Sequence, residues 1–170
     1  MKKEFFSNLV CTLYSKGALL SKATGGKFSA SKELVTILKE SSDVVSVEEI
    51  LSNMGENDLQ GVSIQDGEAV FDGFPQTDDE VEIRAQQMLE KFVKERCAKP
   101  ARILAKPAND ENEKFAFRIW LISLGIKGDE YKAERKVLYK RLSGSVAFRT
   151  EASHQTWLAN QQKRKAAKTA

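Results

Sequence analysis

The pattern of apolar and polar positions predicts a mostly helical chain. In its first third, apolar residues recur every three or four positions, which is the spacing of one helix face. This pattern predicts helices over residues 4–23, 32–40 and 46–54. Gly17 interrupts the first of them, which leaves open one continuous helix or two helices joined at that glycine.

Residues that favour helix ends flank these segments. Gly25-Gly26 follows the first helix, and glycine readily adopts the left-handed conformation that closes a helix. Ser46 and Glu49 form a capping box at the start of the third helix, and Gly55 is expected to end it.

A β-hairpin is predicted over residues 62–71. Apolar residues alternate on both sides of Asp66-Gly67, a dipeptide favoured in two-residue type I′ turns. In the register that this turn sets, Ile64 faces Ala69, so one face of the hairpin is apolar. Two strands alone are marginally stable, so we expect this face to pack against helices.

Helical spacing returns in the second half and predicts helices over residues 78–98, 110–124 and 130–142. The 110–124 segment carries apolar residues almost all the way round, which is typical of a buried helix, so we expect it at the centre of the core. Residues 99–110 form a connector with a short extended stretch at Arg102–Leu104.

Local signals again predict the helix starts in this half. Asp110 with Glu113 is expected to cap the 110–124 helix, and Asp129 the 130–142 helix. The elements define an α+β fold, a mostly helical single domain with one β-hairpin over residues 1–149. Residues 26–58 are either an integral part of it or an insertion or subdomain, and residues 150–170 form a basic tail.

Composition indicates a soluble globular protein. The chain has 170 residues, of which 41% are hydrophobic and 30% charged. This length supports one packed core, and the chain lacks the long apolar run of a membrane span. Two cysteines are too few for a disulfide framework, and the N-terminus does not look like a leader peptide. We therefore expect a cytoplasmic protein that does not bind a membrane.

Residues suited to catalysis are scarce. His154 is the only histidine, and neither Cys11 nor Cys97 has a cysteine or histidine close in sequence, which disfavours zinc sites and histidine-based catalysis. Partial motifs at 29–32 (Ser-x-x-Lys) and 25–27 (Gly-Gly-Lys) are expected to serve as caps and turns. We expect no enzyme activity, no metal or other cofactor, and no small-molecule substrate.

Charge is distributed unevenly along the chain. Residues 1–113 contain 14 Lys/Arg and 20 Asp/Glu, a net charge of −6, whereas residues 114–170 contain 13 and 4, a net charge of +9. Twelve acidic residues lie from Asp43 to Glu82, with no lysine or arginine among them. The asymmetry indicates either two surfaces for different partners or attraction between the two halves within the fold.

The basic half offers candidate nucleic-acid-binding residues. Lys132, Lys136 and Lys140 repeat every four residues and share one helix face, while Tyr131 and Leu138 lie on another. A row of cations suits a phosphate backbone. The candidate set is Lys132, Arg135, Lys136, Lys140, Arg141, Arg149, Lys163, Arg164 and Lys165. DNA is favoured over RNA because no aromatic cluster typical of RNA-binding motifs is present.

Several segments resemble a known protein family. They are Glu111–Arg118, Leu124-Gly125, Gly128–Lys136, Leu142–Ser145, Ala147-Phe148 and, near the N-terminus, Ser15–Leu20. These segments are similar to the small "virulence-related" proteins encoded on conjugative and phage-like elements of anaerobic Gram-positive bacteria. The resemblance implies a mobile-element gene and supplies no catalytic residue. The chain differs from that pattern in the extra sequence between residues 26 and 58 and in the basic tail.

Two hypotheses follow. The first is a non-catalytic accessory protein of a mobile genetic element that binds nucleic acid through the basic C-terminal helix and tail. The second is an inhibitor of a host defence nuclease, similar in action to an anti-CRISPR protein, whose acidic residues occupy a basic protein groove by charge complementarity. Its candidate contact residues are Asp78, Asp79, Glu80 and Glu82.

Overall fold

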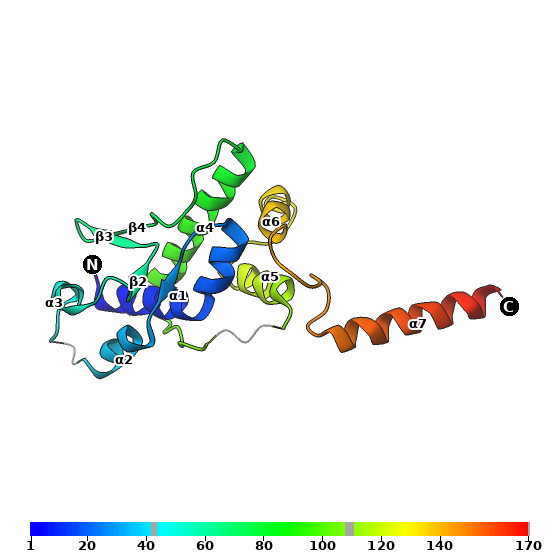
Figure 1. Ribbon diagram of the computed structural model, residues 1–170, viewed down its shortest axis with the longest axis horizontal. Coiled ribbons are helices and arrows are strands. Elements are labelled where there is room, and N and C mark those ends of the chain that lie inside the picture. Colours follow the sequence, from blue (N-terminus) through cyan, green and yellow to red (C-terminus); the bar gives the residue numbers. More distant parts are fainter. Residues whose placement is uncertain (42–43, 108–110, 170) are drawn as a thin grey trace.

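The structure, a computed structural model, describes residues 1–41, 44–107 and 111–169. The elements in chain order are α1 (Lys3–Thr24), β1 (Ser29–Ala30), α2 (Lys32–Glu40), α3 (Val47–Asn53), β2 (Leu59–Gln60), β3 (Ser63–Gln65), β4 (Glu68–Val70), α4 (Glu80–Ala98), α5 (Glu113–Leu124), α6 (Lys132–Tyr139) and α7 (Glu151–Thr169). The fold is α+β and mostly helical, as predicted. Helix α4 packs along α1, α6 packs on α4, and α7 extends away from the other elements (Figure 1).

Helix α1 is the most extensively buried helix. Thirteen of its 22 residues are buried, and it runs unbroken through Gly17, so the single continuous helix is the correct one of the two predicted alternatives. A Cβ atom at Gly17 would lie 2.6 Å from the Phe28 carbonyl oxygen, so glycine allows the following segment to approach closely. The helix ends at Gly25 in the left-handed conformation, φ 77°, as predicted.

A pair of very short strands was not predicted. Strands β1 and β2 pair antiparallel, with Ser29 opposite Gln60 and Ala30 opposite Leu59. Helices α2 and α3 lie between these strands in the chain, and each begins with a serine side chain that accepts a hydrogen bond from the helix backbone. Leu34 of α2 and Ile50 of α3 belong to the same hydrophobic cluster as α1, so this segment shares the common core.

The predicted hairpin is confirmed as β3 and β4. Ile64 pairs with Ala69 in the predicted register. Asp66 and Gly67 have φ of 50° and 77°, which is the type I′ conformation that favours this dipeptide. The apolar face packs inward, where Phe71 lies close to Phe28, with 6.0 Å between their ring centroids.

The connector after α4 is held by side chains of α1. Asn8 is 3% exposed; its Oδ1 accepts from the Ile103 N–H at 2.8 Å, and its Nδ2 donates to the Cys97 carbonyl at 3.2 Å. The Ser15 hydroxyl accepts from the Lys106 N–H at 2.9 Å. The described part of this connector contains no strand, so the extended stretch is tied to α1 rather than to a sheet.

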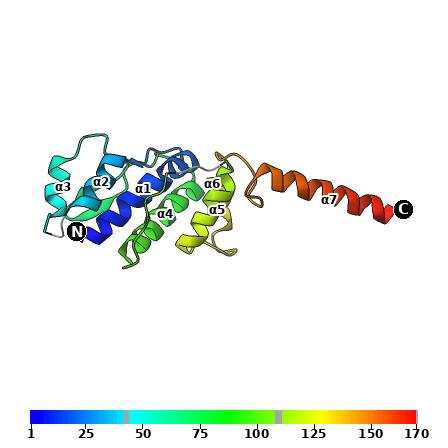
Figure 2. The same cartoon turned by 90° about the horizontal axis from the view of Figure 1, so that it is seen from below.

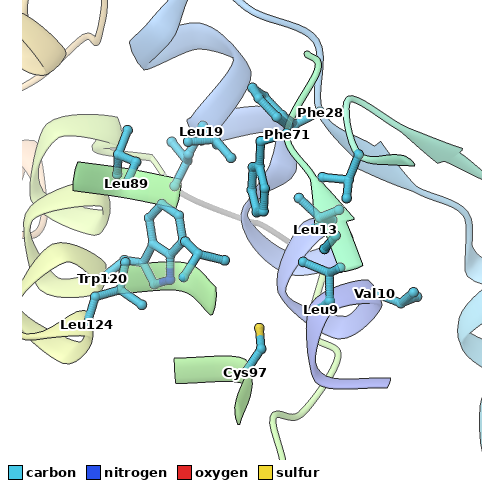
Figure 3. Close-up of a cluster of buried hydrophobic side chains, with 14 of the residues drawn as sticks. Leu9, Val10, Leu13, Leu19, Phe28, Phe71, Leu89, Cys97, Trp120 and Leu124 are labelled. Atoms are coloured by element: carbon cyan, nitrogen blue, oxygen red, sulfur yellow. The ribbon is translucent and has the colours of Figure 1, made fainter. Parts of the chain in front are cut away.

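The expectation that residues 110–124 form the centre of the core is wrong. Helix α5 buries one face, including Trp120 and Leu121, while Ile119 and Ile122 are 48% and 40% exposed. The longer α1 occupies the centre instead, and α5 packs against its neighbours on one side only. Figure 3 shows Trp120 beside α4, between Leu89 and Cys97 in this view. Asn112 caps α5 by accepting from the Phe115 N–H, whereas Asp110 lies outside the described residues.

Helix α6 is shorter than the predicted 130–142. Asp129 does not cap it; its carbonyl instead closes a turn with the Lys132 N–H, and Tyr131 precedes the helix. The Tyr131 ring packs edge-on against Phe92, with 5.6 Å between centroids, which holds this turn against α4. A second turn after Tyr139 brings Leu142 into the core.

Candidate nucleic-acid interface

The lysine row lies on the outer face of α6. Val137 and Leu138 are buried on the opposite face, and Lys132, Lys136 and Lys140 are exposed. At 1.5 Å of rise per residue the row spans about 12 Å. The prediction that this helix docks by one side and presents lysines on another is confirmed.

A partly buried ion pair joins α6 to α4. Arg84 of α4 donates to Glu134 Oε1 at 3.0 Å, and the Glu134 side chain is only 11% exposed. Its own backbone N–H and the Arg84 guanidinium hold the pKa of the Glu134 carboxyl below its ordinary value. The second oxygen, Oε2, is buried without a hydrogen-bond partner. Sequence reasoning missed this pair, because residues 50 positions apart give no local signal.

Two arginines of the candidate set are engaged inside the fold. The Arg141 guanidinium pairs with Glu82 Oε1 at 3.2 Å, and Glu82 also accepts from the Thr77 hydroxyl at 2.8 Å. Arg141 also lies over Gly25, where α1 ends. Arg135 donates to the carbonyl of Gly128. Neither guanidinium projects as part of the lysine row.

The acidic candidates lie at the start of α4, next to the basic helix. Asp79 caps α4 by accepting from the N–H groups of Val81 and Glu82 at 2.8 and 3.1 Å. These hydrogen bonds hold the pKa of the Asp79 carboxyl below its ordinary value, with further lowering by the charges of Lys140 and Arg84. Asp78 and Glu80 are exposed.

The structure therefore brings part of the acidic set and part of the basic set together. Glu82 pairs with Arg141, and the positive charge of Lys140 helps to lower the pKa of the Asp79 carboxyl. At this contact the two halves of the chain attract one another within the fold. The three lysines of α6 remain exposed beside it.

Helix α7 carries the remaining basic candidates. Lys163, Arg164 and Lys165 lie in its distal half and are exposed, and Arg149 is exposed just before it. The helix leads these cations away from α6 rather than adding them to the lysine row (Figure 2). Lys168, exposed near the end of α7, belongs with them and was missed as a site residue, although its place in the basic tail could have indicated it.

The start of α7 is anchored by aromatic side chains. Phe148 stacks on His154 with 4.9 Å between ring centroids and contacts Trp157 at 5.5 Å. The Asn112 side chain, which caps α5, donates to the Phe148 carbonyl. These contacts hold the start of α7. Trp157 is nevertheless 45% exposed, and the rest of the helix projects into solvent (Figure 1).

Residues of the two partial catalytic motifs, 25–27 and 29–32, take part in contacts that hold the fold together. The Ser29 hydroxyl donates to Gln60 across the β1–β2 pair at 3.3 Å, and Lys32 opens α2. A Cβ at Gly26 would lie 2.3 Å from the Gly73 carbonyl oxygen, so this glycine serves a close backbone crossing. Burial raises the pKa of the Cys97 thiol to about 11, which disfavours a thiolate nucleophile.

No group of three or more His, Cys, Asp or Glu within the described ranges is arranged to hold a metal ion. Among the described helices, none is long and apolar enough to cross a membrane. A comparison of the chain with protein-family models, curated proteins and solved structures finds no match. The resemblance to the mobile-element family stays a prediction.

Proposed function

We propose that the protein is a non-catalytic accessory protein of a mobile genetic element, acting in the cytoplasm, that binds nucleic acid, preferably DNA, through α6 and α7. The observation that carries the proposal is helix α7, which projects from the body with Lys163, Arg164, Lys165 and Lys168 toward its end. Glu151 is the only acidic residue after Arg149. An arm of this kind suits a polyanion, because its charges can reach phosphates that the body does not contact.

The α6 row supports the same function by its dimensions. Phosphates follow one another at about 3.4 Å along the axis of one DNA strand, so a row of about 12 Å spans three to four of them. Lys132, Lys136 and Lys140 can therefore each meet a phosphate of one strand. Tyr139, the aromatic residue of α6, packs edge-on against Phe117 of the core, so we expect contacts to phosphates rather than stacking on bases.

The alternative function, inhibition of a defence nuclease through acidic contacts, has less support. Asp79 serves as the cap of α4, and Glu82 is paired with Arg141. Only two of its four residues, Asp78 and Glu80, therefore remain without a role inside the described fold. Nucleic-acid binding is the function we favour.

The test is the salt dependence of binding to a labelled 20-base-pair duplex, measured by fluorescence anisotropy. If three α6 lysines and four α7 cations each neutralise one phosphate, log Kd should change with log salt with a slope of magnitude about 6. Replacing Lys132, Lys136 and Lys140 by Gln should reduce this slope by about 2.7, and replacing the four α7 cations by Gln should reduce it by about 3.6.

A control variant replaces Lys2, Lys32 and Lys39, which are exposed just before α1 and on α2, far in the chain from the proposed interface. It removes as much charge as the α6 variant and should leave the slope nearly unchanged. The proposal fails if the wild-type protein does not bind DNA below 50 mM salt, or if the control and the α6 variant lose affinity equally. Unchanged circular dichroism confirms that each variant is folded.

A further inference from the structure

A second basic site lies inside the body, away from α6 and α7. A cavity of about 440 Å³ opens between α1, α4, α5 and the connector. Its size falls within the range of about 300–1,000 Å³ that is typical of small-molecule sites. Three cationic side chains line it, Lys16, Arg96 and Lys106, and the described residues of its wall include no Asp or Glu.

The cations come from three different elements. Lys16 belongs to α1, Arg96 to the last turn of α4, and Lys106 to the connector. The connector is held in place because Ser15 accepts from the Lys106 N–H and donates to the Leu104 carbonyl. The Arg96 guanidinium donates to the Ala101 carbonyl and has no acidic partner among the described residues. An anion in the cavity can therefore meet the positive charges of Arg96 and Lys106 from two sides.

The floor of the cavity is apolar and includes one polar group without a partner. Val93, Trp120 and Leu124 line it. Trp120 is 8% exposed, and its indole N–H makes no hydrogen bond to any residue that the structure describes. Buried tryptophan N–H groups usually have a partner. Among the described side chains, Glu134 Oε2 is the one fully enclosed polar atom without a partner, so the Trp120 N–H is not fully enclosed, and Trp120 itself lines the cavity.

We propose that this cavity binds a small organic anion. Its carboxylate or phosphate group meets Arg96 and Lys106, and its planar apolar body lies against Trp120, whose N–H donates to it. Sequence analysis predicted no small-molecule ligand. The site depends on the packing of four separate segments, and it is independent of nucleic-acid binding by α6 and α7.

The test uses phenyl phosphate as the probe and the Trp157→Phe variant as the protein, so that Trp120 is the single tryptophan. Titration at constant ionic strength should change the Trp120 emission saturably. The double variant Arg96→Gln/Lys106→Gln should weaken binding at least tenfold. Inorganic phosphate should bind at least tenfold more weakly than phenyl phosphate, because it lacks the apolar body.

A matched control removes the same charge nearby. The double variant Arg118→Gln/Lys127→Gln changes residues of α5 and of the loop that follows it, outside the cavity wall, and should keep wild-type affinity. A thermal shift on addition of phenyl phosphate gives a second readout. The absence of saturable binding, equal weakening in both double variants, or inorganic phosphate binding as tightly as phenyl phosphate would each overturn the proposal.

Discussion

The buried amide of Asn8 is the polar contact on which the packing of the connector depends most. It links α1 to Ile103 at 2.8 Å and to the carbonyl of Cys97 at 3.2 Å. Two further contacts, to the carbonyls of Lys99 and Ala101, are longer, at 3.4 and 3.5 Å, and contribute less. The Asn8→Ala substitution removes all of them and leaves the rest of α1 unchanged.

The expected cost follows from these two good hydrogen bonds. Each contributes about 0.5–1.5 kcal/mol net, and a buried group left without a partner costs about 1–3 kcal/mol. The Ile103 N–H loses its partner, and the half-buried position of Ile103 places this group toward the lower end of that range. We therefore expect Asn8→Ala to lower the free energy of unfolding by about 2–4 kcal/mol. For a chain of this length, that lowers Tm by about 5–15 °C.

Urea unfolding followed by circular dichroism measures this difference. Asn53→Ala is the matched control, because Asn53 is exposed and its side-chain amide donates within α3, to the Glu49 carbonyl. It should change stability by less than about 0.5 kcal/mol. Hydrogen exchange adds a local readout, since the Ile103 N–H should exchange faster in Asn8→Ala. Equal stability of Asn8→Ala and Asn53→Ala would refute the reasoning.

Two further predictions concern the core. Trp120→Ala should lower the free energy of unfolding by about 3–5 kcal/mol, because the indole is 8% exposed and packs on Phe117; a loss below about 1 kcal/mol, measured by urea unfolding, would contradict its burial. Cys11 and Cys97 are buried, and burial raises the pKa of both thiols, that of Cys97 to about 11. A thiol reagent at pH 8 should therefore label neither cysteine in the folded protein and both in urea; rapid labelling of the folded protein would show that the thiols are accessible.

Elements with a strong local signal could be predicted from the sequence. The bounds of α2 agree with the prediction at both ends because Ser31 caps it and its apolar stripe is regular. The hairpin register follows from Asp66-Gly67, whose conformation fits one turn type. In these cases the deciding interactions lie within a few residues of one another.

Elements that depend on distant contacts could not be predicted. The β1–β2 pair joins residues about 30 positions apart through two-residue strands, which have no periodicity to detect. The sequence predicts a central α5 because its residues are apolar on every side, yet burial depends on what surrounds a helix, and Ile119 is 48% exposed. The cavity beside Trp120 likewise appears only when α1, α4, α5 and the connector are assembled.

The distribution of charge could likewise be predicted only in part. The contrast between an acidic and a basic part of the chain is visible in the sequence, but which charges meet is decided by the packing of α4 on α6. Glu82–Arg141 and Arg84–Glu134 join the two parts. Partly exposed pairs such as Glu82–Arg141 contribute about 0–1 kcal/mol each, so stability alone is a weak reason for so large an asymmetry.

The basic charge of helix α7 needs a separate explanation. Its cations lie on an arm that extends away from the acidic start of α4 (Figure 1), so attraction between the two halves of the chain does not account for them. Most of the stability of a protein helix comes from packing one face against the fold, and nearly all described residues of α7 are exposed. A polyanion bound along α7 would supply both countercharge and a reason for the helix to persist, which is why we favour the proposed nucleic-acid binding over a purely structural role for the basic tail.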